Sequence, residues 1–181
     1  MKWAKDGEKV KVLYMIGGTM GAGKTAVCRQ LKKQLPDSVF LDGDWCWDAD
    51  PFQVTEETKR MVLDNICHIL NNFLHCSAYQ TVIFGWVMHE QSIINAILDK
   101  LDLQNCDVFC ISLMVNEKNL EKRLEQDIAK GIRTEDVIGR SVMRIPLYEN
   151  LETIKIDTND KTVSEIAEEV RSISKSANTA I

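Results

Sequence analysis

A run of eight residues near the start of the chain has the composition and spacing of a phosphate-binding loop. It matches the pattern G-x-x-x-x-G-K-[ST] at every position, with Gly18, Thr19, Met20, Gly21, Ala22, Gly23, Lys24 and Thr25 in order. Glycines let the backbone turn tightly and bring its N–H groups against phosphate oxygens, while the lysine adds a point charge and the threonine hydroxyl is a ligand for Mg²⁺. We therefore predict that this loop binds ATP and Mg²⁺. The alternative is a flexible glycine turn followed by a chance Lys-Thr pair.

Two carboxylates, Asp42 and Asp44, follow a short apolar run with only Gly43 between them. If that run is a parallel strand, its carboxyl end lies where α/β sheets bind ligands. We assign Asp42 to Mg²⁺ together with Thr25, and Asp44 to the hydroxyl of an acceptor, as a base or as a positioning group. The alternative is a polar Asp-Gly turn.

Aromatic residues come directly after the acidic pair, at Trp45, Trp47 and Phe52. They either stack on a sugar or base or form a hydrophobic staple beneath a loop. A later apolar run is followed by Gly85, at a place where many P-loop proteins have an aspartate that binds the metal. This absence shifts the metal-binding role to Asp42. That glycine is expected to let a substrate approach closely, and His89 either contacts substrate or caps a helix.

Basic residues concentrate in one segment, as Arg123, Lys130, Arg133, Arg140 and Arg144. We expect arginines of this segment to neutralise charge on the transferring phosphoryl group when a hinge at Gly131 closes it. The alternative is a solvated helix face with an ion pair, because Arg123, Asp127 and Lys130 have helical spacing. Tyr148 either packs on this segment or faces the substrate.

The elements that must position these residues alternate along the chain. Continuous apolar runs predict buried strands over 10–16, 39–41, 81–84, 108–115 and 153–156. Helical patterns lie over 24–34, from Thr55 onward, over 90–101, from about Glu117 and over 165–173. This alternation predicts an α/β fold with a parallel sheet covered by helices on both faces.

Composition narrows the class of protein. A chain of 181 residues with a net charge of −5 predicts one domain, and its acidity disfavours nucleic acid as the main partner. Six cysteines without a Cys-x-x-Cys pair disfavour a zinc site and indicate free thiols in a reducing compartment. The polar residues 1–10 do not resemble a signal peptide, and the sequence has no apolar run of membrane-spanning length. We expect a cytoplasmic protein; the sequence does not predict its oligomeric state.

The phosphate loop, the Asp42-Gly43-Asp44 step and the basic stretch 123–144 together resemble the P-loop small-molecule and nucleotide kinases. These include the shikimate, gluconate, adenylylsulfate and nucleoside monophosphate kinases and chloramphenicol phosphotransferase. The resemblance covers about residues 10–170 and implies a three-layer P-loop NTPase fold, with a five-stranded parallel sheet and a short lid over 128–140. It also implies that Arg123 lies near the adenine, that Arg133 lies near the phosphates, and that Thr158 lines the adenine pocket.

These features predict an ATP-dependent kinase that transfers the γ-phosphoryl group to a small-molecule hydroxyl or a nucleotide. Its catalytic residues would be Lys24, Asp44 and Arg133. Because Lys59 and Arg60 are the only basic residues over 55–75, we expect an uncharged or weakly charged acceptor. The alternatives are a regulatory P-loop ATPase without such an acceptor, or a kinase acting on RNA ends or protein. A GTP switch is disfavoured because 116–119 does not match Asn-Lys-x-Asp.

Overall fold

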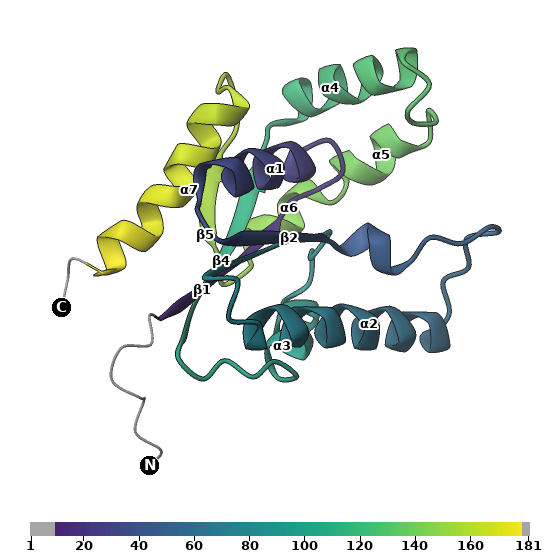
Figure 1. Ribbon diagram of the computed structural model, residues 1–181. Helices are drawn as coiled ribbons and strands as arrows, with labels where there is room; N and C mark the ends of the chain where they lie inside the picture. The colour runs from purple at the N-terminus through teal and green to yellow at the C-terminus, as the bar shows by residue number, and fades with distance from the viewer. Residues whose placement is uncertain (1–9, 179–181) are drawn as a thin grey trace.

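The computed structural model describes residues 10–178, and Figure 1 shows a central sheet between two layers of helices. The five strands are all parallel and lie in the order β2 (Ser38–Asp42), β3 (Thr81–Gly85), β1 (Lys11–Gly17), β4 (Cys106–Met114) and β5 (Ile154–Asp157). The predicted α/β class, parallel sheet and five strands are confirmed. The polar segment noted at the N-terminus lies, over 1–9, outside the described residues.

Each face of the sheet has its own apolar core, because successive side chains of a strand point to opposite faces. On β1, Tyr14 and Ile16 join the core under α1 (Lys24–Gln34), α4 (Glu117–Ala129) and α7 (Val163–Asn178). Leu13 and Met15 join the other core, which packs against α2 (Glu56–His75) and α3 (Gln91–Leu98). The strands are therefore buried on both faces, as their continuous apolar runs predict.

The helices that flank the site begin and end at residues with a clear local cause. α1 begins directly after Gly23 and ends at Gln34, and its C-cap residue Leu35 has the extended backbone that suits the residue before a proline. α2 begins with a reciprocal cap: the Thr55 hydroxyl accepts from the Thr58 N–H at 3.1 Å, and the Thr58 hydroxyl accepts from the Thr55 N–H at 2.8 Å. The cap of α2 fixes the end of the segment that starts at the carboxyl end of β2.

Three differences from the sequence predictions concern the second half of the chain. The helix predicted over 90–101 ends at Leu98, because the following N–H groups bond in tighter turns, such as Lys100 to Ile97 at 3.1 Å. Two short helices that we did not predict, α5 (Val137–Val142) and α6 (Ile145–Glu149), follow α4. The predicted lid over 128–140 therefore consists of the end of α4, a connecting loop and the first part of α5. No helix within 10–178 is long and apolar enough to cross a membrane.

Candidate phosphate-transfer site

The phosphate loop runs from the end of β1 to the start of α1 and is held by residues from distant elements. Gly21 has a φ of +83°, and a Cβ there would lie 2.8 Å from side-chain carbons of Leu120 and Leu124 on α4. Both the backbone conformation and the packing of α4 therefore require glycine. The buried Thr19 hydroxyl donates to the Ser141 carbonyl at 2.9 Å and ties the loop to α5. The loop keeps its shape because α4 and α5 support it.

Lys24, Thr25 and Asp42 lie around this loop as predicted. The Lys24 ammonium donates to the carbonyls of Gly18 at 2.9 Å and Thr19 at 3.0 Å, which holds its charge over the loop. The Thr25 hydroxyl donates to Oδ2 of Asp42 at 2.9 Å, although these residues belong to α1 and β2.

The donor set formed by Thr25 and Asp42 fits Mg²⁺. Their oxygens are hard ligands, and Mg²⁺ commonly uses one or two protein groups and completes its shell with water and phosphate. Asp42 is only 8% exposed, and its second oxygen accepts from the Asp44 N–H at 3.2 Å, so its carboxylate has a fixed orientation. Within the described part of the chain, no three His, Cys, Asp or Glu side chains gather into a metal cluster.

Four charged side chains interact electrostatically at this edge of the sheet. Burial lowers the pKa of Lys24 to about 8, an effect that Asp44 opposes and Arg133 reinforces. Burial and the neighbouring Asp42 raise the pKa of Asp44, while Lys24, Trp86 and Arg133 act to lower it. The structure thus brings the three predicted catalytic residues together with the predicted metal ligand Asp42.

Arg133 lies on the loop after Gly131, which has a φ of +68°. Its Nε donates to Oδ2 of Asp127 on α4 at 3.2 Å, and each side chain is 33% exposed. The alternative of an ion pair within the helix, based on the spacing of Arg123, Asp127 and Lys130, was wrong about the partner, because Asp127 faces Arg133. This ion pair holds the Arg133 guanidinium against α4, and its charge acts to lower the pKa of both Lys24 and Asp44.

Arg123 and Thr158 form the second predicted pair, and they are in direct contact. The guanidinium of Arg123 donates to the Thr158 hydroxyl at 3.1 Å and to its carbonyl at 2.7 Å. Thr158 is fully buried, and its hydroxyl donates to Met114 at the end of β4 at 2.9 Å. These bonds join α4 to the loop after β5, while contact with adenine stays a prediction.

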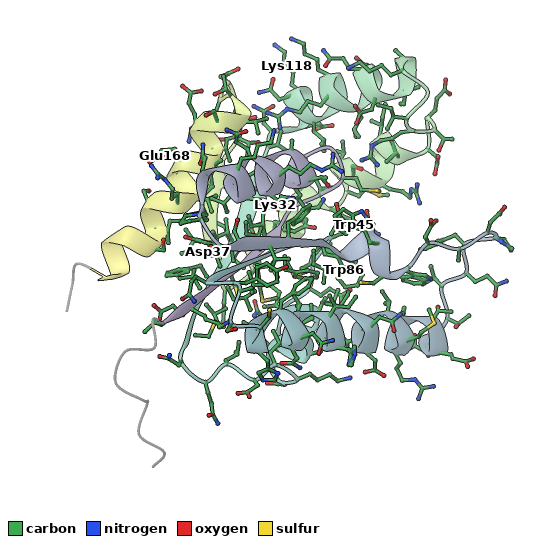
Figure 2. All side chains as sticks on the ribbon, in the orientation of Figure 1. Lys32, Asp37, Trp45, Trp86, Lys118 and Glu168 are labelled. Atoms are coloured by element: carbon green, nitrogen blue, oxygen red, sulfur yellow. The ribbon has the colours of Figure 1, made fainter. Side chains whose placement is uncertain are left out.

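The aromatic residues after the acidic pair differ in how far their rings are buried. Trp47 packs against Phe52 with ring centroids 4.6 Å apart and against the core under α2, as a staple would. Trp45 and Phe52 themselves are 59% and 58% exposed. Trp45 belongs to the short 3₁₀ helix η1 (Gly43–Cys46), and Figure 2 shows it near the carboxyl end of β2.

Three other expectations are changed by the structure. The idea that Gly85 admits substrate was wrong: it is buried, and a Cβ there would lie 2.9 Å from the Cys28 sulfur, so its small size serves core packing. His89 does not cap α3, because Glu90 is the N-cap residue. Tyr148 is 1% exposed and packs against Gly17, so it supports the loop from below.

Two residues without a predicted role, Ser141 and Trp86, lie against residues of the site: Ser141 against Thr19 and Trp86 against Gly43. Ser141 holds the phosphate loop through its carbonyl, a contact without any sequence signature. Trp86 follows Gly85 at the end of β3 and interacts with Asp44. The only available signal was its position directly after a strand that ends at the ligand-binding edge.

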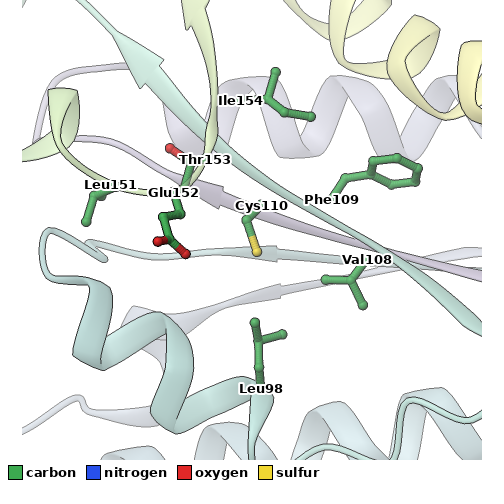
Figure 3. Close-up of a pocket in the computed structure, with 8 residues that line it drawn as sticks. All are labelled: Leu98, Val108, Phe109, Cys110, Leu151, Glu152, Thr153 and Ile154. Atoms are coloured by element: carbon green, nitrogen blue, oxygen red, sulfur yellow. The ribbon is translucent and has the colours of Figure 1, made fainter.

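A cavity of about 600 Å³ lies elsewhere, at the edge of the sheet where β4 extends beyond β5 (Figure 3). It is lined by Leu98, Val108, Phe109, Cys110, Leu151, Glu152, Thr153 and Ile154. The phosphate loop contributes none of these residues, and we assign no ligand to this cavity.

The sheet order β2-β3-β1-β4-β5, with a phosphate loop between β1 and α1, defines the P-loop NTPase fold as small kinases have it. The AAA domain family matches residues 15–142, and the chain belongs to that family. The match includes the phosphate loop, the acidic pair and Arg133. No significant match is found among curated protein sequences.

Several solved structures, two kinases among them, are similar to the chain in fold. The tunicamycin resistance protein of Deinococcus radiodurans has a TM-score of 0.69 at 16% identity, covering 90% of this chain and 94% of that one. Shikimate kinase from Acinetobacter baumannii, in complex with shikimate, has a TM-score of 0.60 at 20% identity, covering 93% and 94%. The APS kinase CysC of Mycobacterium tuberculosis, in complex with AMPPNP and APS, has a TM-score of 0.62 at 13% identity, covering 93% and 99%. The predicted P-loop kinase fold is confirmed.

Proposed function

We propose that the protein is an ATP-dependent kinase that transfers the γ-phosphoryl group to a hydroxyl of a small molecule. One observation carries the proposal: Asp44 stands beside Lys24 and Asp42 but is not used in the contact between Thr25 and Asp42. A protein that only binds or hydrolyses ATP needs the lysine and the metal ligands. A second carboxylate with a raised pKa at the same edge is suited to accept the proton of an attacking hydroxyl.

Each residue has a role that follows from its position. The backbone N–H groups of the loop and the N-terminus of α1 would hold the phosphates of ATP, and Lys24 and Arg133 would stabilise the charge that moves with the phosphoryl group. Mg²⁺ held by Thr25 and Asp42 would neutralise phosphate oxygens. Asp44 would orient the acceptor hydroxyl and take its proton. Arg123 and Thr158 would flank the adenine.

The segment between β2 and α2 supports an uncharged or weakly charged acceptor with an apolar part. It contains no basic residue, and Lys59, one of the two basic residues over 55–75, lies at the start of α2 and is already paired with Glu56 at 2.9 Å. Trp45, Phe52 and Val54 are among the most exposed large apolar side chains of the described residues, at 59%, 58% and 59%. Exposed apolar patches commonly mark ligand-binding surfaces. A cytoplasmic location stays a prediction.

The test follows label from γ-labelled ATP, with Mg²⁺, into pooled alcohols, sugars, nucleotides and antibiotics. We expect one pool to yield a labelled compound, and Lys24→Ala to reduce this transfer by about a hundredfold to a thousandfold. Lys32→Ala, which removes an exposed lysine from the same helix, is the matched control and should keep full transfer.

Three outcomes would contradict the proposal. Release of labelled phosphate at a rate unaffected by every pool would indicate a regulatory ATPase. Label on RNA ends or on protein would show that the acceptor class is wrong. Full transfer by Lys24→Ala would place the chemistry away from the phosphate loop.

A further inference from the structure

One face of α4 packs against the phosphate loop and also carries an acid. Leu120 and Leu124 on that face lie against Gly21, where a Cβ would be 2.8 Å from a carbon of each. Asp127 follows Leu120 by seven residues and Leu124 by three, so its side chain leaves the helix on the same face, about 4.5 Å further along the axis. The Asp127 side chain is 33% exposed. α4 therefore presents a partly buried carboxylate next to the surface that covers the phosphate loop.

The chain turns back toward this carboxylate directly after α4. The Gly131 N–H donates to the Ile128 carbonyl at 2.8 Å, and the Ile132 N–H donates to the Asp127 carbonyl at 2.9 Å. With Gly131 at a φ of +68°, these two bonds form the Schellman motif that ends many helices. The motif reverses the chain, so the next residue, Arg133, comes back beside Asp127. Its Nε donates to Oδ2 of Asp127 at 3.2 Å.

The segment that carries Arg133 connects two helices that both contact the phosphate loop. It starts from α4, whose leucines pack on Gly21, and it leads into α5, whose Ser141 carbonyl accepts from the Thr19 hydroxyl at 2.9 Å. Figure 1 shows α4 and α5 joined by this short segment. The guanidinium is therefore held on a support that is itself fixed to the phosphate loop from both ends.

Asp127 occupies only one of the three nitrogens of the guanidinium. The ion pair uses Nε, and within residues 10–178 no hydrogen bond or ion pair engages the terminal nitrogens Nη1 and Nη2 of Arg133. Those two nitrogens carry four of the five donors of the side chain, in the planar arrangement that binds phosphate oxygens in pairs. Arg133 can thus bind a phosphoryl group without leaving Asp127.

We propose that Asp127 is a positioning residue for Arg133: it holds Nε from α4, so that the two terminal nitrogens meet the phosphoryl group as it moves. The role in transfer rests on the proposed kinase function, whereas the orientation of the guanidinium does not. An arginine side chain has many rotamers, and fixing one of them before the substrates bind removes an entropic cost from the transfer step.

The orientation is tested by NMR on protein labelled with ¹⁵N-arginine, and Arg133→Lys identifies the Arg133 Nε–H signal by its loss. A carboxylate partner slows the exchange of this proton with water. We expect Asp127→Asn to shift the signal and speed its exchange. Asp136→Asn, which removes the partner of Arg140 at 2.7 Å in the same segment, should leave it unchanged. The slow exchange should persist when Mg²⁺ and ATP are added. A signal insensitive to Asp127→Asn, or one that loses its protection on addition of ATP, would overturn the proposal.

The positioning role is tested by a double-mutant cycle on transfer to the acceptor found in the labelling screen. Asp127→Asn keeps the size of the side chain but removes its charge, so turnover should fall about tenfold, while KM for ATP changes less than about twofold. In the background of Arg133→Ala the same substitution should have no further effect, because Asp127 acts only through that guanidinium. Asp127→Glu keeps the charge and should recover most of the turnover. Asp136→Asn should leave it unchanged.

The failure of this role and the failure of the kinase function give different results. If the wild-type protein labels no acceptor, the kinase function fails, while the NMR signal still decides whether Asp127 holds Arg133. If the wild type transfers label and Asp127→Asn slows transfer equally with and without the Arg133 side chain, the kinase function stands and the positioning role is overturned. Faster transfer by Asp127→Asn would also overturn it, because the ion pair would then keep Arg133 away from the phosphates.

Discussion

The two halves of the candidate site differ in how firmly they are built. The phosphate loop is held by a buried bond from Thr19 to Ser141 and by Leu120 and Leu124 packed against Gly21. The segment between β2 and α2 instead exposes two of its rings, Trp45 at 59% and Phe52 at 58%. A triphosphate needs amide groups in fixed positions, so its loop is supported from several elements. The acceptor half relies on side chains at the surface, which can vary without disturbing the loop.

The same contrast appears in the charges of the two halves. Burial lowers the pKa of Lys24 in the phosphate half and raises the pKa of Asp44 in the acceptor half. Both shifts disfavour the charged form, and each is limited by the opposite charge of the other residue. The site thus holds a cation for the phosphates near a carboxylate that is more basic than usual, one in each half.

The largest effect that separates the halves is expected from Asp44→Asn. The amide keeps the size of the side chain but cannot accept the hydroxyl proton, so transfer should slow by about a hundredfold or more. The affinity for ATP should stay nearly the same, because the loop and Lys24 are untouched. Calorimetry with ATP and the labelled-transfer rate measure the two quantities, with Asp48→Asn as control. Lost ATP affinity with unchanged turnover would place Asp44 in the phosphate half.

The phosphate half could be predicted from the sequence because its parts are close in sequence. Eight consecutive residues specify the loop, and the strand before Asp42 places that acid at the correct edge. The contacts that complete the site join residues far apart in the chain, such as Thr19 with Ser141 and Gly43 with Trp86. Nothing in the local pattern of either partner specifies such a pair, because packing between elements creates it.

The sequence predictions that were wrong also failed because packing between distant elements decided the outcome. The prediction that Gly85 admits substrate was wrong because Cys28, on α1, packs directly against this glycine. The expected ion pair within α4 was wrong because the loop that starts at Gly131 brings Arg133 back to Asp127. α5 and α6 are too short for an apolar period to emerge from the sequence, so they were not predicted. In each case the sequence indicated the type of residue but not its neighbour.

A smaller effect concerns pH and affects only the phosphate half. The pKa of Lys24 is lowered to about 8 from 10.5, so the free protein loses this ammonium as pH rises through about 8. A bound triphosphate favours the charged form, so ATP affinity should be constant at lower pH and fall above about pH 8, by at most about tenfold per pH unit. The stability of the nucleotide-free protein should change in the opposite sense: between about 8 and 10.5 the unfolded chain binds the extra proton, so Lys24 adds stability as pH rises.

Calorimetry of ATP binding from about pH 7 to pH 9.5 measures this dependence. Lys24→Arg should remove it, even if the variant binds more weakly, because a guanidinium does not titrate in this range. Lys32→Ala should keep the wild-type curve. A pH dependence that survives Lys24→Arg would assign the titration to another group.

The smallest effect should be confined to the acceptor half. Trp45→Ala removes an exposed ring next to Asp44, and stacking of an aromatic side chain on a ligand contributes about 0.5–1.5 kcal/mol, so KM for the acceptor should rise about twofold to tenfold. KM for ATP should not change, because Trp45 has no contact with the loop among those described. Val163→Ala, which changes a solvent-facing apolar residue at the start of α7, is the control. Equal changes in both KM values would show that the two halves are coupled, and an unchanged acceptor KM would move the apolar contact to Phe52 or Val54.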